Sequence, residues 1–337
     1  MILVTGGTGL LGAHLLLELA RQGKEIRALK RPSSKLDYVK LIFDHYADNS
    51  DELLGRINWA EGDVLDIISL AEAMQDVEYI YHVAAVVSFH KKDKHQMMQA
   101  NVEGTANMVN VALDKSVRKF CYVSSIASLG RAEHNGLIDE HTKWASAKEN
   151  SQYGISKYRA EREIWRGIEE GLDAVVVNPS VILGLANPDS GSTQIFATMW
   201  NGLKFYTTGV NGFVDVRDVV KVMIQLMDSN IRNEGFVVSA ENLSYKDLFW
   251  KIADIYDKPR PRIRVTKILS GLAWRAFKVF SLFTGKTPLI TRETAITALE
   301  EFRYSNEKVR KNLDFEFIDI RKTIEDVGKG VQKYYLK

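Results

Sequence analysis

The sequence predicts an α/β fold built on a doubly wound parallel sheet, with a smaller, mostly helical lobe in its carboxyl-terminal part. Short apolar, β-branched runs alternate with longer segments of helical periodicity, which is typical of parallel strands joined by helices. The first run, Ile2–Val4, leads directly into a glycine-rich turn and then a leucine-rich segment. The chain has 337 residues, which is long for one compact core, so we expect two domains, or one large domain and a lobe.

The glycine-rich turn has the composition of a dinucleotide-binding loop. Gly6, Gly9 and Gly12 follow the spacing G-x-x-G-x-x-G. Glycine at such positions allows a sharp turn, a close approach of backbone N–H groups to a pyrophosphate, and close packing of helix on strand. The positive end of the helix dipole would then face the phosphates. Because the usual fingerprint is G-x-G-x-x-G, a glycine-rich turn without a ligand is the alternative.

Composition argues against several other classes of protein. The formal net charge of +2 is nearly balanced, which argues against general nucleic-acid binding. The single cysteine, Cys121, excludes an internal disulfide and a multi-cysteine zinc site, and its apolar neighbours predict a core position. A first strand that begins at residue 2 leaves no room for a signal peptide, and no uncharged apolar run reaches spanning length. We therefore expect a soluble, cytoplasmic protein without membrane insertion.

A second strand, predicted over Glu25–Lys30, indicates which nicotinamide cofactor is preferred. In an NAD-preferring fold, an acidic residue about twenty positions past the glycines holds the ribose 2′-hydroxyl. Lys30 and Arg31 occupy this place here. Because a guanidinium group suits a phosphate and a carboxylate would repel one, NADP(H) is the predicted cofactor. NAD(H) stays an alternative, as does an ordinary basic loop.

Two further strands are predicted near Ile57–Ala60 and over Tyr79–Ala85, and the small residues that end the second would let the chain pass under a cofactor. His82, within this strand, is interpreted as a packed core residue. In the following segment, Ser88–His95, two histidines lie five residues apart, which misses the same-face spacing of a helical metal site. We therefore predict no metal and a solvated loop, in which Phe89 is the residue expected to face a substrate.

A tyrosine and a lysine then stand at a spacing suited to acid–base chemistry. Tyr153 and Lys157 are four residues apart, so on a helix they share one face, and they follow a strand, Phe120–Val123, that ends in two serines. A unit charge about 4 Å from a phenol, at an effective dielectric of about 20, is worth roughly 4 kcal/mol, or about three pKa units. Free tyrosine has a pKa of about 10. Lys157 could therefore lower the pKa of Tyr153 to roughly 7. We expect Tyr153 to act as the general acid or base of a hydride transfer.

The loop at residues 5–12, TGGTGLLG, and the Tyr153–Lys157 pair, placed 28 residues after Ser-Ser, together resemble the extended branch of the short-chain dehydrogenase/reductase superfamily. The same branch is known as the NAD-dependent epimerase/dehydratase family. His82–Ala85 and Asn101–Asn107 resemble the family elements H-x-A-A and N-x-x-G-T-x-N. Within the family, the chain looks most like the dihydroflavonol-reductase and 3β-hydroxysteroid-dehydrogenase group. The resemblance implies a Rossmann fold with strand order 3-2-1-4-5-6.

The resemblance also assigns roles to particular residues. It makes Ser125 the serine that hydrogen-bonds the substrate oxygen, with Ser124 as a substitute. It places Asp63 on the adenine amino group, although a helix N-cap is the alternative and Asp66 could supply that cap instead. It implies that Asn101 supports the active-site architecture.

The element at residues 178–184 resembles the family's R-P-x-x-x-x-G beside the nicotinamide. Here Asn178 stands where Arg is common, so Pro179 is the better cofactor-side candidate. The predicted catalytic residues are Ser125, Tyr153 and Lys157. The predicted cofactor-binding residues are Gly6, Thr8, Gly9, Leu10, Leu11, Gly12, Arg31, Asp63, Val64, Ala84, Ala85, Asn101, Ser124, Tyr153, Lys157 and Pro179. The substrate-side candidates are Phe89, Ile126 and Asn178.

The expected domains follow the same resemblance, which is strongest over residues 1–184 and weakest over 243–337. Residues 1–178 form a dinucleotide-binding domain, completed by about 210–242, where Phe213–Val220 resembles a return strand and helix. Asp218 in this element is interpreted as a helix cap or an interdomain hydrogen-bond partner. Residues 179–209 and 243–337 form the substrate lobe.

The last third of the chain leaves alternatives open. On a strand, Arg260, Arg262 and Arg264 would share one face and could hold a diphosphate, although a solvated edge strand is the other interpretation. Lys267–Phe283 has the pattern of an apolar helix that could cover a pocket, pack in the core, or lie at a membrane surface. Ile318–Tyr335 is predicted to close the chain as a helix.

The expected function is NAD(P)-dependent reduction of a ketone or aldehyde, or oxidation of the matching alcohol, on a fairly apolar small molecule. One alternative is a nucleotide-sugar epimerase or dehydratase that keeps its cofactor tightly bound. Another is a dinucleotide-binding sensor without catalysis. The sequence leaves the substrate unnamed and the existence of a homodimer open.

Overall fold

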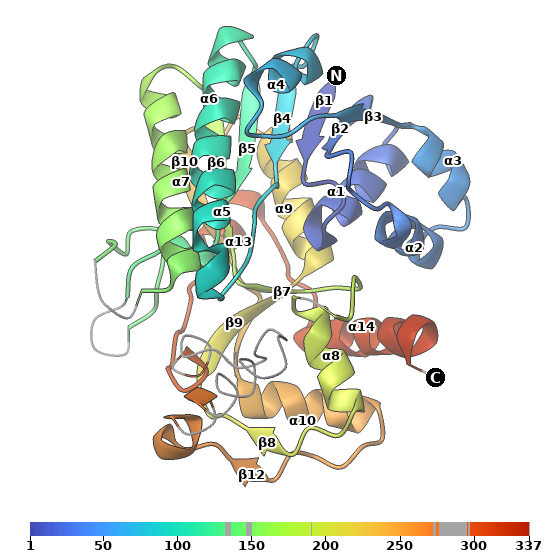
Figure 1. Ribbon diagram of the computed structural model, residues 1–337, viewed down its shortest axis with the longest axis vertical. Coiled ribbons are helices and arrows are strands. Elements are labelled where there is room, and N and C mark those ends of the chain that lie inside the picture. The colour runs from blue at the N-terminus through green and yellow to red at the C-terminus, as the bar shows by residue number, and fades with distance from the viewer. Residues whose placement is uncertain are drawn as a thin grey trace.

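In the computed structural model, the described residues are 1–131, 136–145, 150–189, 191–271, 274–275, 295 and 297–336. Within them, the central sheet has seven parallel strands in the order β10-β6-β5-β4-β1-β2-β3 (Figure 1). This confirms the predicted order 3-2-1-4-5-6, to which β10 adds one edge strand. The strands are β1 (Ile2–Thr5), β2 (Ile26–Lys30), β3 (Ile57–Glu61), β4 (Tyr79–His82), β5 (Lys119–Val123), β6 (Ala174–Pro179) and β10 (Glu234–Val238).

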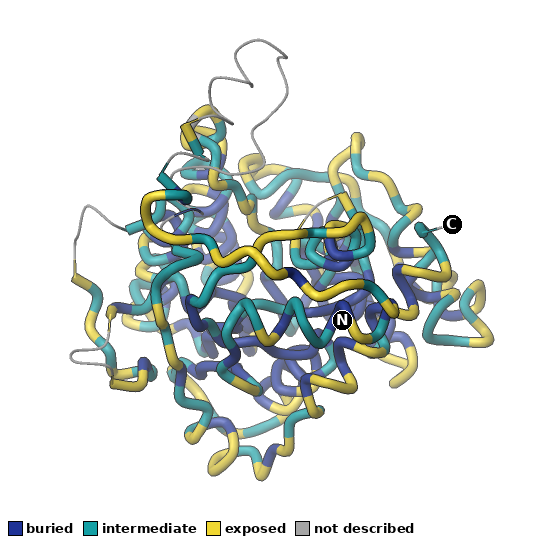
Figure 2. Tube along the Cα trace, turned by 90° about the horizontal axis from the view of Figure 1, so that it is seen from below, coloured by how far each residue is buried: buried dark blue, intermediate teal, exposed yellow. Residues whose placement is uncertain are grey.

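Helices cover both faces of this sheet, as the near-continuous apolar strands require. On β5, Phe120 and Tyr122 pack on one face, whereas Cys121 and Val123 pack on the other, because side chains alternate along a strand. The first face is covered by α4 (Ile67–Ala73), α6 (Gly104–Asp114) and α7 (Gln152–Glu169). The second face is covered by α1 (Leu10–Arg21), α2 (Asp37–Tyr46), α3 (Ser50–Gly55), α9 (Val216–Asp228) and α13 (Glu307–Leu313). Figure 2 shows the buried interior enclosed by exposed loops.

A second group of elements lies beyond the carboxyl edge of the sheet, in the lower half of Figure 1. Its three-stranded sheet has the order β11-β9-β7 and a two-stranded sheet pairs β12 with β8. The strands are β7 (Val181–Leu183), β8 (Phe205–Tyr206), β9 (Val210–Asp215), β11 (Glu241–Ser244) and β12 (Ile263–Arg264). The helices are α8 (Thr193–Trp200), α10 (Tyr245–Ile255) and α14 (Ile320–Tyr335). A separate apolar cluster holds these helices against β7 and β9, while α9 and β10 return the chain to the central sheet.

The segment after β4 corrects one expectation. The solvated loop predicted over Ser88–His95 ends early, because a 3₁₀ turn at Lys91–Asp93 leads into α5 (Lys94–Met98). A π-helical turn, Gln99–Glu103, then joins α5 to α6, so the helix does not begin at Asn101 as predicted. The cause is packing: Met97 is fully buried, and this anchor lies within a polar stretch whose local pattern does not reveal it.

The last third follows the prediction only in part. Arg260 forms a two-pronged ion pair with Asp254, with both N–O distances at 2.8 Å, and β12 is limited to Ile263–Arg264. Residues 267–271 are helical, and the remainder of the predicted 267–283 helix, apart from residues 274–275, lies outside the described residues. The closing helix α14 begins after Asp319, which caps it. In the part of the chain that the structure describes, no helix has both the length and the apolar character needed to cross a membrane.

Candidate active site

The predicted site residues gather at the carboxyl edge of the central sheet. Each lies at the end of a strand, in the loop that follows it, or on a helix packed beside these loops. Because neighbouring strands are parallel, their carboxyl ends meet at one edge, and such an edge is where doubly wound sheets bind ligands. The fold therefore brings together residues that are up to about 170 positions apart in the sequence.

The glycine loop after β1 fits a pyrophosphate. Gly6 has a φ of +72°, and a Cβ there would lie 2.6 Å from the backbone nitrogen of Ala84. A Cβ on Gly12 would lie 2.1 Å from the Gly6 carbonyl oxygen, so both positions require glycine. In contrast, a Cβ on Gly9 would meet only that same oxygen, at 3.5 Å. Gly9 caps α1 without a side-chain hydrogen bond, so no capping side chain occupies the first-turn amides of α1, which could bind an anion.

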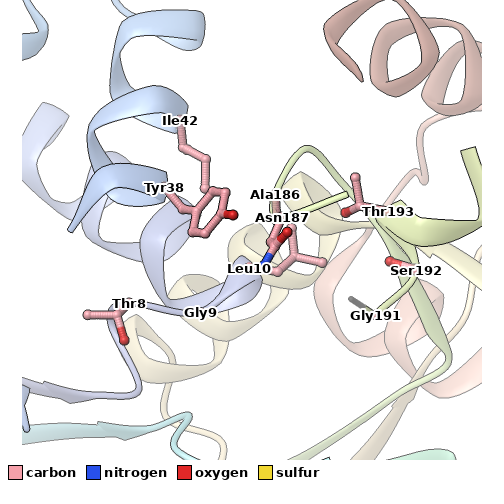
Figure 3. Close-up of a pocket in the computed structure, with 10 residues that line it drawn as sticks. All are labelled: Thr8, Gly9, Leu10, Tyr38, Ile42, Ala186, Asn187, Gly191, Ser192 and Thr193. Carbon is pink, nitrogen blue, oxygen red and sulfur yellow. The ribbon is translucent and has the colours of Figure 1, made fainter. Parts of the chain in front are cut away.

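A cavity of about 240 Å³ lies directly against this loop. In Figure 3, Thr8, Gly9 and Leu10 form one side, Tyr38 of α2 another, and Asn187 of the segment after β7 a third. Sequence reasoning did not identify Tyr38 or Asn187, since neither belongs to a motif. The cavity extends the dinucleotide-binding surface toward the second group of elements.

Arg31 and Asp63 follow β2 and β3. Arg31 is exposed, and within the described residues its guanidinium has no hydrogen-bond or ion-pair partner, whereas the neighbouring Lys30 pairs with Glu61 at 2.9 Å. The Asp63 carboxylate accepts a hydrogen bond from the Leu65 amide at 3.0 Å. Asp66 caps α4 through the Ile68 amide, so the helix cap that was the alternative role for Asp63 is supplied by Asp66.

Tyr153, Ser125 and Phe89 meet at the same edge. Ser151 caps α7 through the Gly154 amide at 2.8 Å, which places Tyr153 in the first turn. The Ser125 side chain lies close enough to the phenol to act on its pKa, and the Phe89 ring stands edge-on to the Tyr153 ring at 5.9 Å between centroids. Burial raises the pKa of Tyr153, while the nearby Ser125 side chain acts in the opposite direction. The phenol is therefore protonated at neutral pH.

Lys157 is almost fully buried, one turn further along α7. Its Nζ donates to the Tyr122 hydroxyl at 2.8 Å and to the Val123 carbonyl at 2.7 Å. Burial lowers the pKa of Lys157 to about 7, against an opposing effect of Glu161. The expectation that Lys157 lowers the pKa of Tyr153 is wrong for this arrangement, because atoms of β5 hold the ammonium and desolvation dominates at the phenol.

The two serines after β5 have different partners. Ser124 donates to the Glu161 carboxylate at 2.6 Å, whereas Ser125 accepts from the Ala127 amide at 3.1 Å and acts on the pKa of the Tyr153 phenol. Of the two, Ser125 is thus the one that adjoins the phenol. Asn178 is only 2% exposed and donates to the same carboxylate at 2.9 Å. The substrate-side assignment of Asn178 is corrected: this side chain lies behind the serine turn, within the protein.

Asn101 and His82 support the site from behind. Asn101 donates to the Ser156 hydroxyl at 3.0 Å and exchanges two hydrogen bonds with the backbone of Val86, which ties the loop after β4 to α7. The His82 ring lies between Thr5 and Thr105, at 2.7 and 3.0 Å. Burial, aided by the charge of Lys157, lowers the pKa of His82 to about 3. His82 is a neutral core residue, as expected.

The other predicted residues take less central places. Ile126 is buried in a small apolar cluster with Ile138 and Tyr304. Cys121 is fully buried, and burial raises the pKa of its thiol, which confirms a core residue. Asp218 accepts from the Ile318 amide at 2.8 Å, the predicted hydrogen-bond role, while Asp215 caps α9.

A parallel sheet with a glycine loop at its carboxyl edge and a Ser–Tyr–Lys group beside it defines a nicotinamide-dinucleotide enzyme of the extended short-chain dehydrogenase/reductase type. A model of the NAD-dependent epimerase/dehydratase family matches residues 2–239. The chain belongs to this family.

Relatives include both reductases and epimerases. A Synechocystis protein named as a dihydroflavonol 4-reductase is 29% identical over 343 residues, which span 99% of this chain and 95% of the relative. Sterol demethylase protein B of Methylococcus capsulatus is 29% identical over 274 residues, which span 80% and 79%. The solved UDP-glucose 4-epimerase of Thermotoga maritima has a TM-score of 0.77 and 18% identity and covers 98% of each chain. This last likeness shows the fold alone.

Proposed function

We propose that this protein is an NADP(H)-dependent oxidoreductase that reduces a ketone or aldehyde of a fairly apolar small molecule, or oxidises the matching alcohol. The observation that carries the proposal is the buried Tyr153 phenol, which lies edge-on to the ring of Phe89 and has the Ser125 side chain near enough to act on its pKa. A polar pair of this kind can hold and protonate one oxygen, while the aromatic wall suits an apolar body.

Ser125, Tyr153 and Lys157 each have a separate role in the proposed reaction. When bound, the nicotinamide cofactor supplies or accepts the hydride. Ser125 donates a hydrogen bond to the substrate oxygen, and Tyr153 delivers the proton. Because burial raises the pKa of Tyr153, the phenol holds its proton at neutral pH, which favours its use as an acid in reduction. When protonated, Lys157, which the Tyr122 hydroxyl and the Val123 carbonyl hold, adds positive charge one turn along α7 from Tyr153.

The cofactor preference rests on Arg31. Its guanidinium is exposed at the carboxyl end of β2, free of protein partners within the described residues. A free guanidinium at this position suits the 2′-phosphate of NADP(H). The first-turn amides of α1, beside Gly9, would hold the pyrophosphate, and Asp63 the adenine amino group.

The residues available for a diphosphate argue against a nucleotide-sugar substrate. Its diphosphate needs well-placed cations, yet Arg260 pairs with Asp254. Arg262, just before β12, and Arg264, within it, are both exposed. Asn178 replaces the arginine that is common in the family and is itself buried. The names of the reductase and sterol-related relatives also favour an apolar substrate.

Substrate profiling tests this function. The protein would be incubated with NADPH and a panel of apolar ketones and aldehydes, and separately with UDP-, GDP- and dTDP-sugars, and both cofactor and products would be quantified. We expect one NADPH to be consumed per alcohol formed. Sugar conversion without net cofactor oxidation would reject the reductase assignment in favour of an epimerase.

A further inference from the structure

The middle of α7 carries a carboxylate that no motif predicted and that lies against the catalytic loop. Glu161 Oε2 accepts from the Ser124 hydroxyl at 2.6 Å and from the Asn178 amide at 2.9 Å, and the Ser128 hydroxyl lies 2.8 Å from it. Its other oxygen accepts from the Trp165 indole at 3.2 Å. One side chain thus joins the end of β5, the 3₁₀ turn after it, β6 and α7.

These partners flank Ser125 on both sides. Ser124 precedes it, and Ser128 closes the turn, with its hydroxyl 2.7 Å from the Ser125 carbonyl. The Asn178 amide reaches that same carbonyl at 3.3 Å. Since Ser128 has a single proton, it can donate to either the carbonyl or Glu161, and both choices hold the turn in the same place. The turn that presents Ser125 to Tyr153 is therefore fastened from behind by Glu161.

Glu161 also places a negative charge near Lys157. Within the described residues, the titratable groups around Lys157 are Tyr122 of β5, whose hydroxyl it bonds, and Tyr153 and Glu161, four positions before and after it on α7. His82 of β4 is also near, since the charge of Lys157 lowers its pKa. The histidine is neutral and the phenols are protonated, so Glu161 is the one anion among these groups. Its charge opposes the desolvation that drives the Lys157 ammonium toward its neutral form.

We propose that Glu161 is a positioning residue of the active site, which holds the Ser124–Ser128 turn in place and sets a negative charge one helical turn from Lys157 on α7. This inference rests on the proposed function, because it assigns Glu161 to the same Ser125, Tyr153 and Lys157 group. It differs from a purely structural role in one respect: removal of the charge alone must change the titration of Lys157.

The decisive variant is Glu161→Gln, which preserves shape and an acceptor oxygen but removes the charge. We expect Lys157 to lose its proton at a pH lower by about one unit. The fall of kcat on the alkaline side of its pH profile should then shift to lower pH by the same amount. Glu163→Gln is the matched control, because Glu163 lies on the same helix but pairs with Arg166 at 2.9 Å near the surface. Glu161→Asp, which keeps the charge, should restore the pH at which kcat falls.

The Lys157 titration is measured directly by NMR on protein with isotope-labelled lysine. The Lys157 signal is the one that is absent from the spectrum of Lys157→Arg. This readout needs no substrate. An unchanged titration in Glu161→Gln overturns the electrostatic part of the proposal, whatever the enzyme reduces. A lowered titration in a protein that reduces none of the carbonyls would support the role of Glu161 and reject the proposed function.

The fastening of the turn is tested by Ser128→Ala, which removes one partner and leaves the carboxylate charged. We expect kcat to fall several-fold, with the Lys157 titration and the KM for the cofactor unchanged. An unchanged kcat would overturn this part of the proposal. Because this variant is independent of Glu161→Gln, the proposal stays falsifiable even if loss of the carboxylate prevents folding.

Discussion

Replacing Tyr153 by phenylalanine removes the proton donor and little else. The ring keeps its edge-on contact with Phe89, and the lost group is one buried hydroxyl near Ser125. The loss of one hydrogen bond costs about 1 kcal/mol of stability. In contrast, loss of the general acid should lower kcat by about two to four orders of magnitude, which corresponds to roughly 3 to 5 kcal/mol of transition-state stabilisation.

This prediction is checked by steady-state turnover, by NADPH titration and by thermal melting of the same preparation. We expect a large fall in kcat with nearly unchanged cofactor affinity and a small change in Tm. Tyr158→Phe is the matched control, because that ring is on the same helix and stacks on Trp144 at 4.5 Å, away from Ser125. A Tyr153→Phe protein with turnover within tenfold of the parent would refute the assignment of the acid.

Three further predictions concern the cofactor, the buried lysine and the glycine loop. Calorimetry should show NADPH binding at least about tenfold tighter than NADH, a difference of ~1.4 kcal/mol. Arg31→Asp should reverse this order of affinity. Equal affinities for the two cofactors in the parent protein would contradict the role of Arg31. Burial lowers the pKa of Lys157 to about 7 in the folded protein, while an unfolded lysine titrates near ~10.4. Between these two pH values the unfolded chain binds more protons than the folded protein, so the free energy of unfolding should rise with pH. Thermal melts should therefore show Tm increasing with pH, and increasing less in Lys157→Met. Gly12→Ala should abolish folding or NADPH binding, since its Cβ would lie 2.1 Å from the Gly6 oxygen, whereas Gly55→Ala, which meets no atom within 4 Å, should preserve both; a Gly12→Ala protein with normal affinity refutes the close approach.

The fold was predictable because its signals are local. The alternation of Phe120 and Cys121 between two sheet faces, and the glycine spacing after Val4, are readable in short windows of sequence. The helix α5 was missed for the opposite reason. Its stability comes from the burial of Met97 by distant elements, which a polar local pattern does not show.

The candidate site was predictable only where a motif marks it. Tyr153, Lys157 and Ser125 belong to such motifs, and the structure brings the phenol and Ser125 close together. Glu161 escaped notice because on α7 it looks like an ordinary helical carboxylate. Its importance arises from Asn178, 17 positions away in the chain, which the fold places beside it. The direction of the pKa shift of Tyr153 was also unpredictable, because it depends on burial and not on sequence spacing.

Isotope transfer tests most directly the proposal that this chain catalyses hydride transfer from NADPH to an apolar carbonyl. The protein would be given NADPH deuterated at the transferred position together with the best ketone or aldehyde of the panel, and the product examined by mass spectrometry. We predict one deuterium in each alcohol formed, one NADPH oxidised per product, and loss of both in Tyr153→Phe. An unlabelled product, or conversion of a nucleotide sugar with no net oxidation of NADPH, would contradict it.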